Sequence, residues 1–241
     1  MTMPDSRTRA RIVSVHVGPA RRFDGQDTGR SWVSAIDKNA VTGPVRVTWE
    51  NLAGDEQADR RHQGGVDKAV FVYPADHYPA WRRELSLPSV GPGSFGENLA
   101  VEGLTEDDVC LGDVWDVGEV RLQVSQPRRP CWKPARRWGV DDLVPRIRAS
   151  GRTGWYLRVL TRGSLRAGES MVLHERPYPQ WPLTRVDRTM HAPADDPATA
   201  RELAQCPALP DRWREEIIRR LDRARRPEDG DGDADRLRRA G

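Results

Sequence analysis

The stretch DVWDVGEVRLQV, residues 113–124, contains the clearest β-hairpin signal in this chain of 241 residues. A Gly-Glu turn separates two short apolar arms. In the second arm Val120, Leu122 and Val124 alternate with polar residues, which is the period of a strand that buries one face. The sequence therefore predicts two paired strands joined by a tight turn.

Similar short runs occur throughout residues 11–175. They are rich in β-branched or aromatic residues and are bounded by Gly, Pro or Asp, and they lie at 12–17, 45–49, 69–73, 155–160 and 170–174. Many short strands with long irregular connections favour a closed or nearly closed barrel, because closure removes exposed strand edges. Helical patterns interrupt the strands at 74–85 and 143–149. We predict a mainly β fold with α insertions.

The chain changes character after Pro182. Asp196 precedes a proline, as at a helix start, and a later helix carries Trp213, Ile217 and Leu221 four residues apart on one face. A Gly/Asp-rich tail follows this helical unit. We predict a disordered N-terminus at 1–10, a barrel domain at 11–180, a three-helix domain at 181–226 and a disordered tail at 227–241.

Composition narrows the function classes. The formal net charge of +3 gives no global field for nonspecific nucleic-acid binding, and no apolar run approaches the ~20 residues that span a bilayer. The N-terminus lacks the apolar core of a secretory signal. The three cysteines are far apart and form no CxxC pair, which argues against a structural zinc site or a disulfide framework. We therefore expect a cytoplasmic protein that contacts neither membrane nor nucleic acid.

Cys131, in SQPRRPCWKPARR, is the residue with the strongest chemical signal. Arg128, Arg129 and Lys133 lie within three positions of its sulfur, and nearby cations favour the reactive thiolate. Three prolines hold the surrounding loop extended or turned. The basic stretch 128–152 also suggests an anionic ligand. The alternative is a small buried thiol in a solvated basic loop, and these residues alone do not decide between the two.

A second candidate cluster is RRHQGGVDKAV. Gly64 and Gly65 let the backbone approach an anion, and Lys68 offers a point charge for a phosphate. His62 and Asp67 flank the glycines. A plain turn with a structural histidine explains the same residues.

A third cluster, GPGSFGENLAVEGL, places Asn98 where its amide could bind the edge of a heterocycle or stabilise a turn. The acidic run 106–108 after Thr105 is interpreted as a helix-start cap.

Taken in order, HQGGVDKAV with YPADHYPAW, FGENL, GLTEDDVCLGD and VSQPRRPCWK resemble the MOSC domain family, and most closely its bacterial YiiM-type members. This resemblance covers roughly residues 10–175. The segment from LTRVDRTMH to REEIIRRL is similar to the small three-helix domain that follows the barrel in those proteins.

The resemblance implies a β-barrel that holds a molybdenum cofactor, with the Cys131 thiolate as metal ligand. It implies a basic cradle for the terminal phosphate of the pterin, for which the candidates are Arg128, Arg129, Lys133 and Lys68. The remaining cofactor-binding candidates are the residues at motif positions of the family: His62, Gly64, Gly65, Asp67 and Asn98.

Related proteins are reductases of N-hydroxylated compounds, including hydroxylamino-purine base analogues, so the resemblance implies this activity. Because the chain shows neither a dinucleotide-binding fingerprint nor iron–sulfur spacing, we expect a separate electron donor of the flavin or iron–sulfur type. The alternative from another class is a sulfur or cofactor carrier with a persulfide on Cys131. A nucleic-acid-binding module using residues 128–152 is the weakest candidate.

Overall fold

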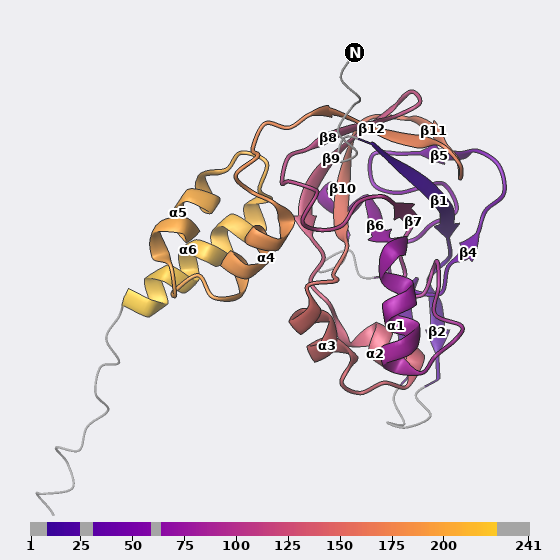
Figure 1. Ribbon diagram of the computed structural model, residues 1–241, viewed down its shortest axis with the longest axis horizontal. Coiled ribbons are helices and arrows are strands. Elements are labelled where there is room, and N and C mark those ends of the chain that lie inside the picture. The colour runs from indigo at the N-terminus through magenta and orange to yellow at the C-terminus, as the bar shows by residue number, and fades with distance from the viewer. Residues whose placement is uncertain (1–8, 25–30, 59–63, 226–241) are drawn as a thin grey trace, which may run out of the picture.

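The computed structural model describes residues 9–24, 31–58 and 64–225. Seven strands close into a barrel in the order β1, β12, β8, β9, β10, β6, β7 and back to β1 (Figure 1). Neighbouring strands are antiparallel except β6 and β7, which are parallel. Their bounds are Arg9–Val17 for β1, Val70–Pro74 for β6, Leu99–Glu102 for β7, Val114–Val117 for β8, Val120–Pro127 for β9, Trp155–Thr161 for β10 and Ser170–Glu175 for β12. The predicted closed barrel and the β8–β9 hairpin are confirmed.

Shorter strands extend this barrel. Strand β4, Asn39–Ala40, pairs with the end of β1. Two small two-stranded sheets accompany the barrel. One pairs β2 (Arg21–Phe23) with β3 (Trp32–Ser34), and the other pairs β5 (Val45–Val47) with β11 (Gly163–Leu165).

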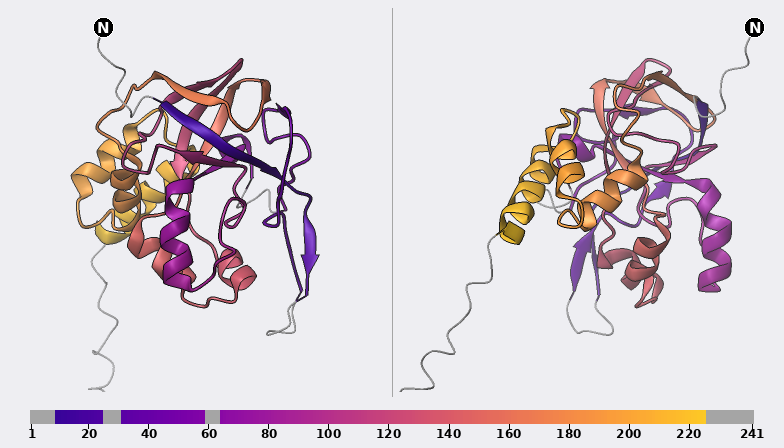
Figure 2. Two further views of the ribbon diagram at one scale, coloured as in Figure 1. Left: turned by 45° about the vertical axis from the view of Figure 1, so that its right-hand side comes forward. Right: turned by 60° about the vertical axis from the view of Figure 1, so that its left-hand side comes forward.

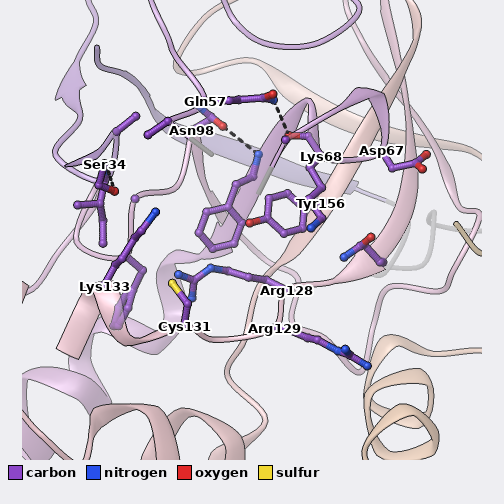
Figure 3. Close-up of a pocket in the computed structure, with 18 of the residues that line it drawn as sticks. Ser34, Gln57, Asp67, Lys68, Asn98, Arg128, Arg129, Cys131, Lys133 and Tyr156 are labelled. Carbon is purple, nitrogen blue, oxygen red and sulfur yellow. Dashed lines mark hydrogen bonds between the residues drawn. The ribbon is translucent and has the colours of Figure 1, made fainter. Parts of the chain in front are cut away.

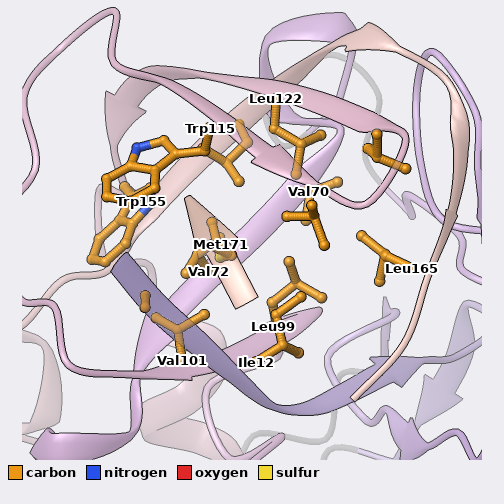
Figure 4. Close-up of a cluster of buried hydrophobic side chains, with 14 of the residues drawn as sticks. Ile12, Val70, Val72, Leu99, Val101, Trp115, Leu122, Trp155, Leu165 and Met171 are labelled. Carbon is orange, nitrogen blue, oxygen red and sulfur yellow. The ribbon is translucent and has the colours of Figure 1, made fainter. Parts of the chain in front are cut away.

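Large side chains fill the barrel interior (Figure 4). Trp115 and Trp155 are each 1% exposed, and Leu122 on β9 is fully buried, as the alternation in the hairpin predicts. The inside of a small closed barrel is therefore packed core and leaves a ligand site to one end or to a flank.

Helices cover one end and one flank of the barrel (Figures 1 and 2). At the end lie α1 (Tyr78–Leu85), α2 (Trp132–Trp138) and α3 (Leu143–Ser150), with the 3₁₀ turn η3 (Ala75–His77) between β6 and α1. A second 3₁₀ turn, η2 (Val66–Lys68), precedes β6 and packs against β9 and β10. At the flank lie α4 (Leu183–His191), α5 (Pro197–Gln205) and α6 (Asp211–Arg225), which share a separate apolar core. None of the helices in the described part of the chain is long and apolar enough to cross a bilayer.

The predicted helical unit has the expected local features. Asp196 caps α5, since its side chain accepts a hydrogen bond from the Thr199 backbone N–H at 3.0 Å. Trp213, Ile217 and Leu221 are buried on one face of α6. The extents 11–180 and 181–226 remain predictions, and the predicted disordered ends lie almost entirely outside the described residues.

Two local predictions are wrong. The loop after Cys131 is the helix α2, because Pro134 occupies its first turn, where a backbone N–H has no helical partner to lose. The acidic run 106–108 forms a turn in which Asp108 accepts from the backbone N–H and hydroxyl of Thr105, and no helix begins there.

Candidate functional site

A cavity of about 460 Å³ lies where the end of the barrel meets α2 and α6 (Figure 3). This volume falls within the usual range of small-molecule sites, about 300–1,000 Å³. Segments far apart in sequence line it: 34–38, 55–58, 64–71, 95–98, 126–133, Tyr156 and 210–216. The helical domain therefore contributes a wall to the cavity.

Cys131 is half-buried and lines this cavity. It stands between the end of β9 and the start of α2, where its backbone is extended. The backbone N–H of Arg128 donates to the Gly154 carbonyl at 2.9 Å, which anchors the chain just before the turn. Figure 3 shows the sulfur in the same space as the side chains of Arg128 and Lys133. The predicted thiol thus faces a cavity with cations around it.

The other two cysteines are buried. Burial, with the nearby Asp113 carboxylate, raises the pKa of Cys110 to about 11. Burial also raises the pKa of Cys206. Neither thiol lines the cavity, so Cys131 is the cysteine placed to meet a ligand there.

Arg128 forms part of the cavity wall. It is 6% exposed, and its guanidinium lies 4.8 Å from the centroid of the Phe71 ring. Burial raises the pKa of the neighbouring Tyr156, and the charge of Arg128 opposes that rise. Because a guanidinium keeps its charge at any ordinary pH, Arg128 fixes a positive charge beside Cys131.

Lys133 and Lys68 bring two further cations from separate elements. Lys133 lies in the first turn of α2 and is buried. Lys68 ends η2, with its ammonium 5.7 Å from the centroid of the Tyr156 ring. Both line the cavity, in keeping with the predicted basic cradle.

Arg129 also lines the cavity, but its guanidinium contacts α6. It donates to Glu216 at 2.6 Å and lies 4.7 Å from the centroid of the Trp213 ring. Burial disfavours the charged form of Glu216, yet the hydrogen bond and charge of Arg129 outweigh it and hold the pKa of Glu216 below its ordinary value. Arg129 therefore joins the helical domain to the cavity wall.

The predicted glycine cluster is mostly a turn. Gly65 has a φ of +93°, which favours glycine, and its N–H donates to Gln57 Oε1 at 3.1 Å. Asp67 pairs with Arg158 at 2.8 Å. Gly64 and Asp67 line the cavity, whereas Gly65 does not. His62 lies outside the described residues.

Asn98 lines the cavity with its amide already engaged. Its Oδ1 accepts from the Phe71 N–H at 3.0 Å, and its Nδ2 donates to Asp55 at 2.9 Å and to the His16 carbonyl at 3.2 Å. Both amide hydrogens are thus used within the protein, and Asn98 holds β1, β6 and the Asp55 loop together.

Sequence patterns missed an ion pair at the edge of the cavity. Lys38 donates to Asp55, and both line the cavity, although 17 residues separate them. One composition signal was available: the chain has only three lysines among its 39 cationic side chains, and all three line this cavity. The α6 residues Trp213 and Glu216 were also missed as lining residues, since nothing local in sequence marks a helix as part of a distant wall.

The donor set can be tested against a molybdenum cofactor. No group of three or more His, Cys, Asp or Glu side chains that could hold a metal occurs among the residues described. A metal at Cys131 therefore needs most of its ligands from an organic cofactor, as a dithiolene would supply. The cations around the sulfur suit an anionic phosphate, so the residues present fit such a group.

Comparison with known proteins gives matches in both parts of the chain. The MOSC domain model matches residues 59–172, and the YiiM-like 3-alpha helix domain model matches residues 181–224. The crystal structure of YiiM from Geobacillus stearothermophilus superposes with a TM-score of 0.75 at 36% identity, covering 88% of this chain and 99% of that one.

Two curated relatives have similar identity. The uncharacterized protein YflK of Bacillus subtilis is 37% identical over 89% of this chain and 96% of its own length. A protein of Gibberella moniliformis named "Reductase" is 38% identical over 76% of this chain, which spans 32% of that longer protein. The chain belongs to the MOSC domain family, with the three-helix domain of YiiM-like proteins behind its barrel.

Proposed function

We propose that this protein binds a molybdenum cofactor and reduces N-hydroxylated compounds, such as hydroxylamino-purine base analogues. The observation that supports the proposal most is the position of Cys131 on a cavity lined by Arg128 and by every lysine of the chain. The relative named "Reductase" supports an oxidoreductase role for the fold.

In this proposal Cys131 holds the metal through its thiolate. Arg128, Lys133 and Lys68 supply positive charge for the phosphate, and Arg129 is a weaker candidate because Glu216 already pairs with it. The cofactor supplies two-electron redox chemistry when bound.

The protein contributes shape and charge. The rings of Phe71 and Tyr156, with centroids 5.2 Å apart, give the cavity an apolar surface beside Arg128. Trp213 and Glu216 on α6 line the cavity on the side of the helical domain. Electrons come from a separate flavin or iron–sulfur protein, which is part of the proposal.

Expression with molybdate, followed by an assay with a hydroxylamino-purine and a reduced viologen dye, tests this function. We expect bound pterin, stoichiometric molybdenum and formation of the amine, with activity lost in Cys131→Ala. A protein that carries a sulfane adduct on Cys131 and no metal would instead support the sulfur-carrier function. Metal-loaded protein that leaves every N-hydroxylated substrate unchanged would refute the reductase.

A further inference from the structure

The pair of Lys38 and Asp55 is unusual for its place in the fold. Their side chains are 6% and 5% exposed, yet both line the cavity. A buried ion pair is a poor source of stability, because desolvation of two charges offsets much of their attraction. Because the pair carries this desolvation cost beside the cavity, we expect it to have a functional role in addition to its structural one.

The carboxylate is anchored from two sides. Asp55 accepts from the Gly18 N–H at 3.0 Å and from Asn98 Nδ2 at 2.9 Å, in addition to Lys38. Glycine is required at position 18, because a β-carbon there would collide with the Asp37 carbonyl. The residues just after β1 and just before β7 thus hold Asp55, and Asp55 holds the ammonium of Lys38 beside the cavity.

The residue type matters as much as the position. The chain uses arginine almost everywhere that it needs a cation, and its three lysines all line one cavity. An arginine keeps its proton at any ordinary pH, whereas a lysine in a buried setting can give its proton up. Lys38, held against the Asp55 carboxylate, can therefore exchange a proton at a position where an arginine could not.

The electrostatic surroundings agree with this. Burial lowers the pKa of Lys38 below its ordinary value, and the charges of Asp55 and Glu97 only partly oppose that effect. The neighbouring ring is His16 on β1, whose pKa burial also lowers, so it adds no fixed positive charge near neutral pH.

We propose that Lys38, held by Asp55, is the acid that protonates the oxygen leaving an N-hydroxylated substrate. The step rests on the proposed function. The N–O bond breaks, R–NH–OH takes up two electrons and two protons, and R–NH₂ and H₂O are released. The electrons originate from the flavin or iron–sulfur partner. Lys38 delivers a proton to the oxygen and is reprotonated from solvent through the cavity.

Lys38→Arg is the decisive variant, because it keeps a positive charge for Asp55 but cannot release a proton. We expect unchanged cofactor content, a similar KM and a kcat lower by roughly 10²–10⁴-fold, the usual contribution of general acid catalysis. The donor works when protonated, so wild-type kcat should fall as pH rises through the pKa of Lys38, and the variant should lose this limb. A kcat near that of wild type in Lys38→Arg, with the alkaline limb intact, would overturn the donor role.

A second measurement needs no activity. In cofactor-free protein, the lysines are reductively methylated over a range of pH and the products are assigned by mass spectrometry, which is simple with three lysines. We expect Lys38 to react and to titrate below about 10.4, the reference for lysine, and lower still in Asp55→Asn. A Lys38 that never reacts, or that titrates at the ordinary value, contradicts the proposal.

The two hypotheses fail differently. Loaded wild-type protein without activity on N-hydroxylated substrates refutes the proposed function and the donor step together. An active wild type with an unimpaired Lys38→Arg refutes the donor step alone.

Discussion

Removing the Asp55 carboxylate should destabilise the protein even when no cofactor is bound. In Asp55→Asn, Lys38 keeps a buried charge without its counterion, and the Asn98 amide faces a group that no longer accepts as well. Breaking a buried ion pair on one side costs about 3–5 kcal/mol. We expect the free energy of unfolding of the cofactor-free protein to fall by about this amount near pH 7, measured by urea titration.

The matched control is Asp116→Asn. Asp116 pairs with Arg121 across the β8–β9 hairpin, where the two side chains are 34% and 39% exposed. An exposed pair contributes about 0.2–1 kcal/mol, so this variant should lose far less than Asp55→Asn.

The unpaired charge of Lys38 in Asp55→Asn makes the loss of unfolding free energy depend on pH. Burial holds the pKa of Lys38 below its ordinary value in the folded protein, and loss of Asp55 lowers it further. Between that pKa and about 10.4 the unfolded chain binds more protons, so stability rises with pH. The deficit of Asp55→Asn should therefore shrink at alkaline pH, and a second change, Lys38→Met, should restore much of the stability. A deficit no larger than that of the control, or a double variant that loses the sum of both single losses, would contradict a buried ion pair between Lys38 and Asp55.

Three further outcomes are expected. Gly154→Ala should cost about 2–5 kcal/mol in urea titration, because a β-carbon would collide with a backbone oxygen of β6 in addition to the strain of positive φ. Gly151→Ala, with the same φ of +69° but open space, should lose only the smaller strain, and equal losses would contradict the collision. Glu216→Gln should be less stable than wild type at neutral pH, because pairing with Arg129 depresses the pKa of Glu216. The stability that the ionised Glu216 contributes is present above about pH 4.3 and is lost as pH falls through its pKa in the folded protein. A stability difference between variant and wild type that persists in strong acid would contradict this pairing. A thiol reagent should label half-buried Cys131 in native protein before the two buried cysteines, and mass spectrometry showing the reverse order would contradict the site.

Local patterns predicted much of the barrel because its strands are short and have strong turn signals. The hairpin at 113–124 has both a period of two and a tight turn, and it forms β8 and β9 as expected. Helix α2 was missed because the prolines were expected to keep the residues before them out of the α region, although Pro134 lies in the first turn, where it is tolerated. Elements with a sequence signal of ten or so residues were therefore predicted. The exception was α2, where the effect of proline depends on its position within the helix.

The cavity could be predicted only in part. The cations near Cys131 are adjacent in sequence, so their clustering was visible. Contacts such as that between Lys38 and Asp55, or between Arg129 and Glu216, join segments 17 and 87 residues apart. Such pairs follow from barrel closure and the docking of α6, which a local pattern does not contain.

The role of Cys131 as metal ligand is tested by the molybdenum content of three purified proteins expressed with molybdate: wild type, Cys131→Ala and Cys110→Ala. We expect stoichiometric metal in wild type and in Cys110→Ala, and loss of metal from Cys131→Ala with an unchanged circular dichroism spectrum. Metal retained by Cys131→Ala, or lost from Cys110→Ala, would show that the sulfur at the cavity is not the ligand.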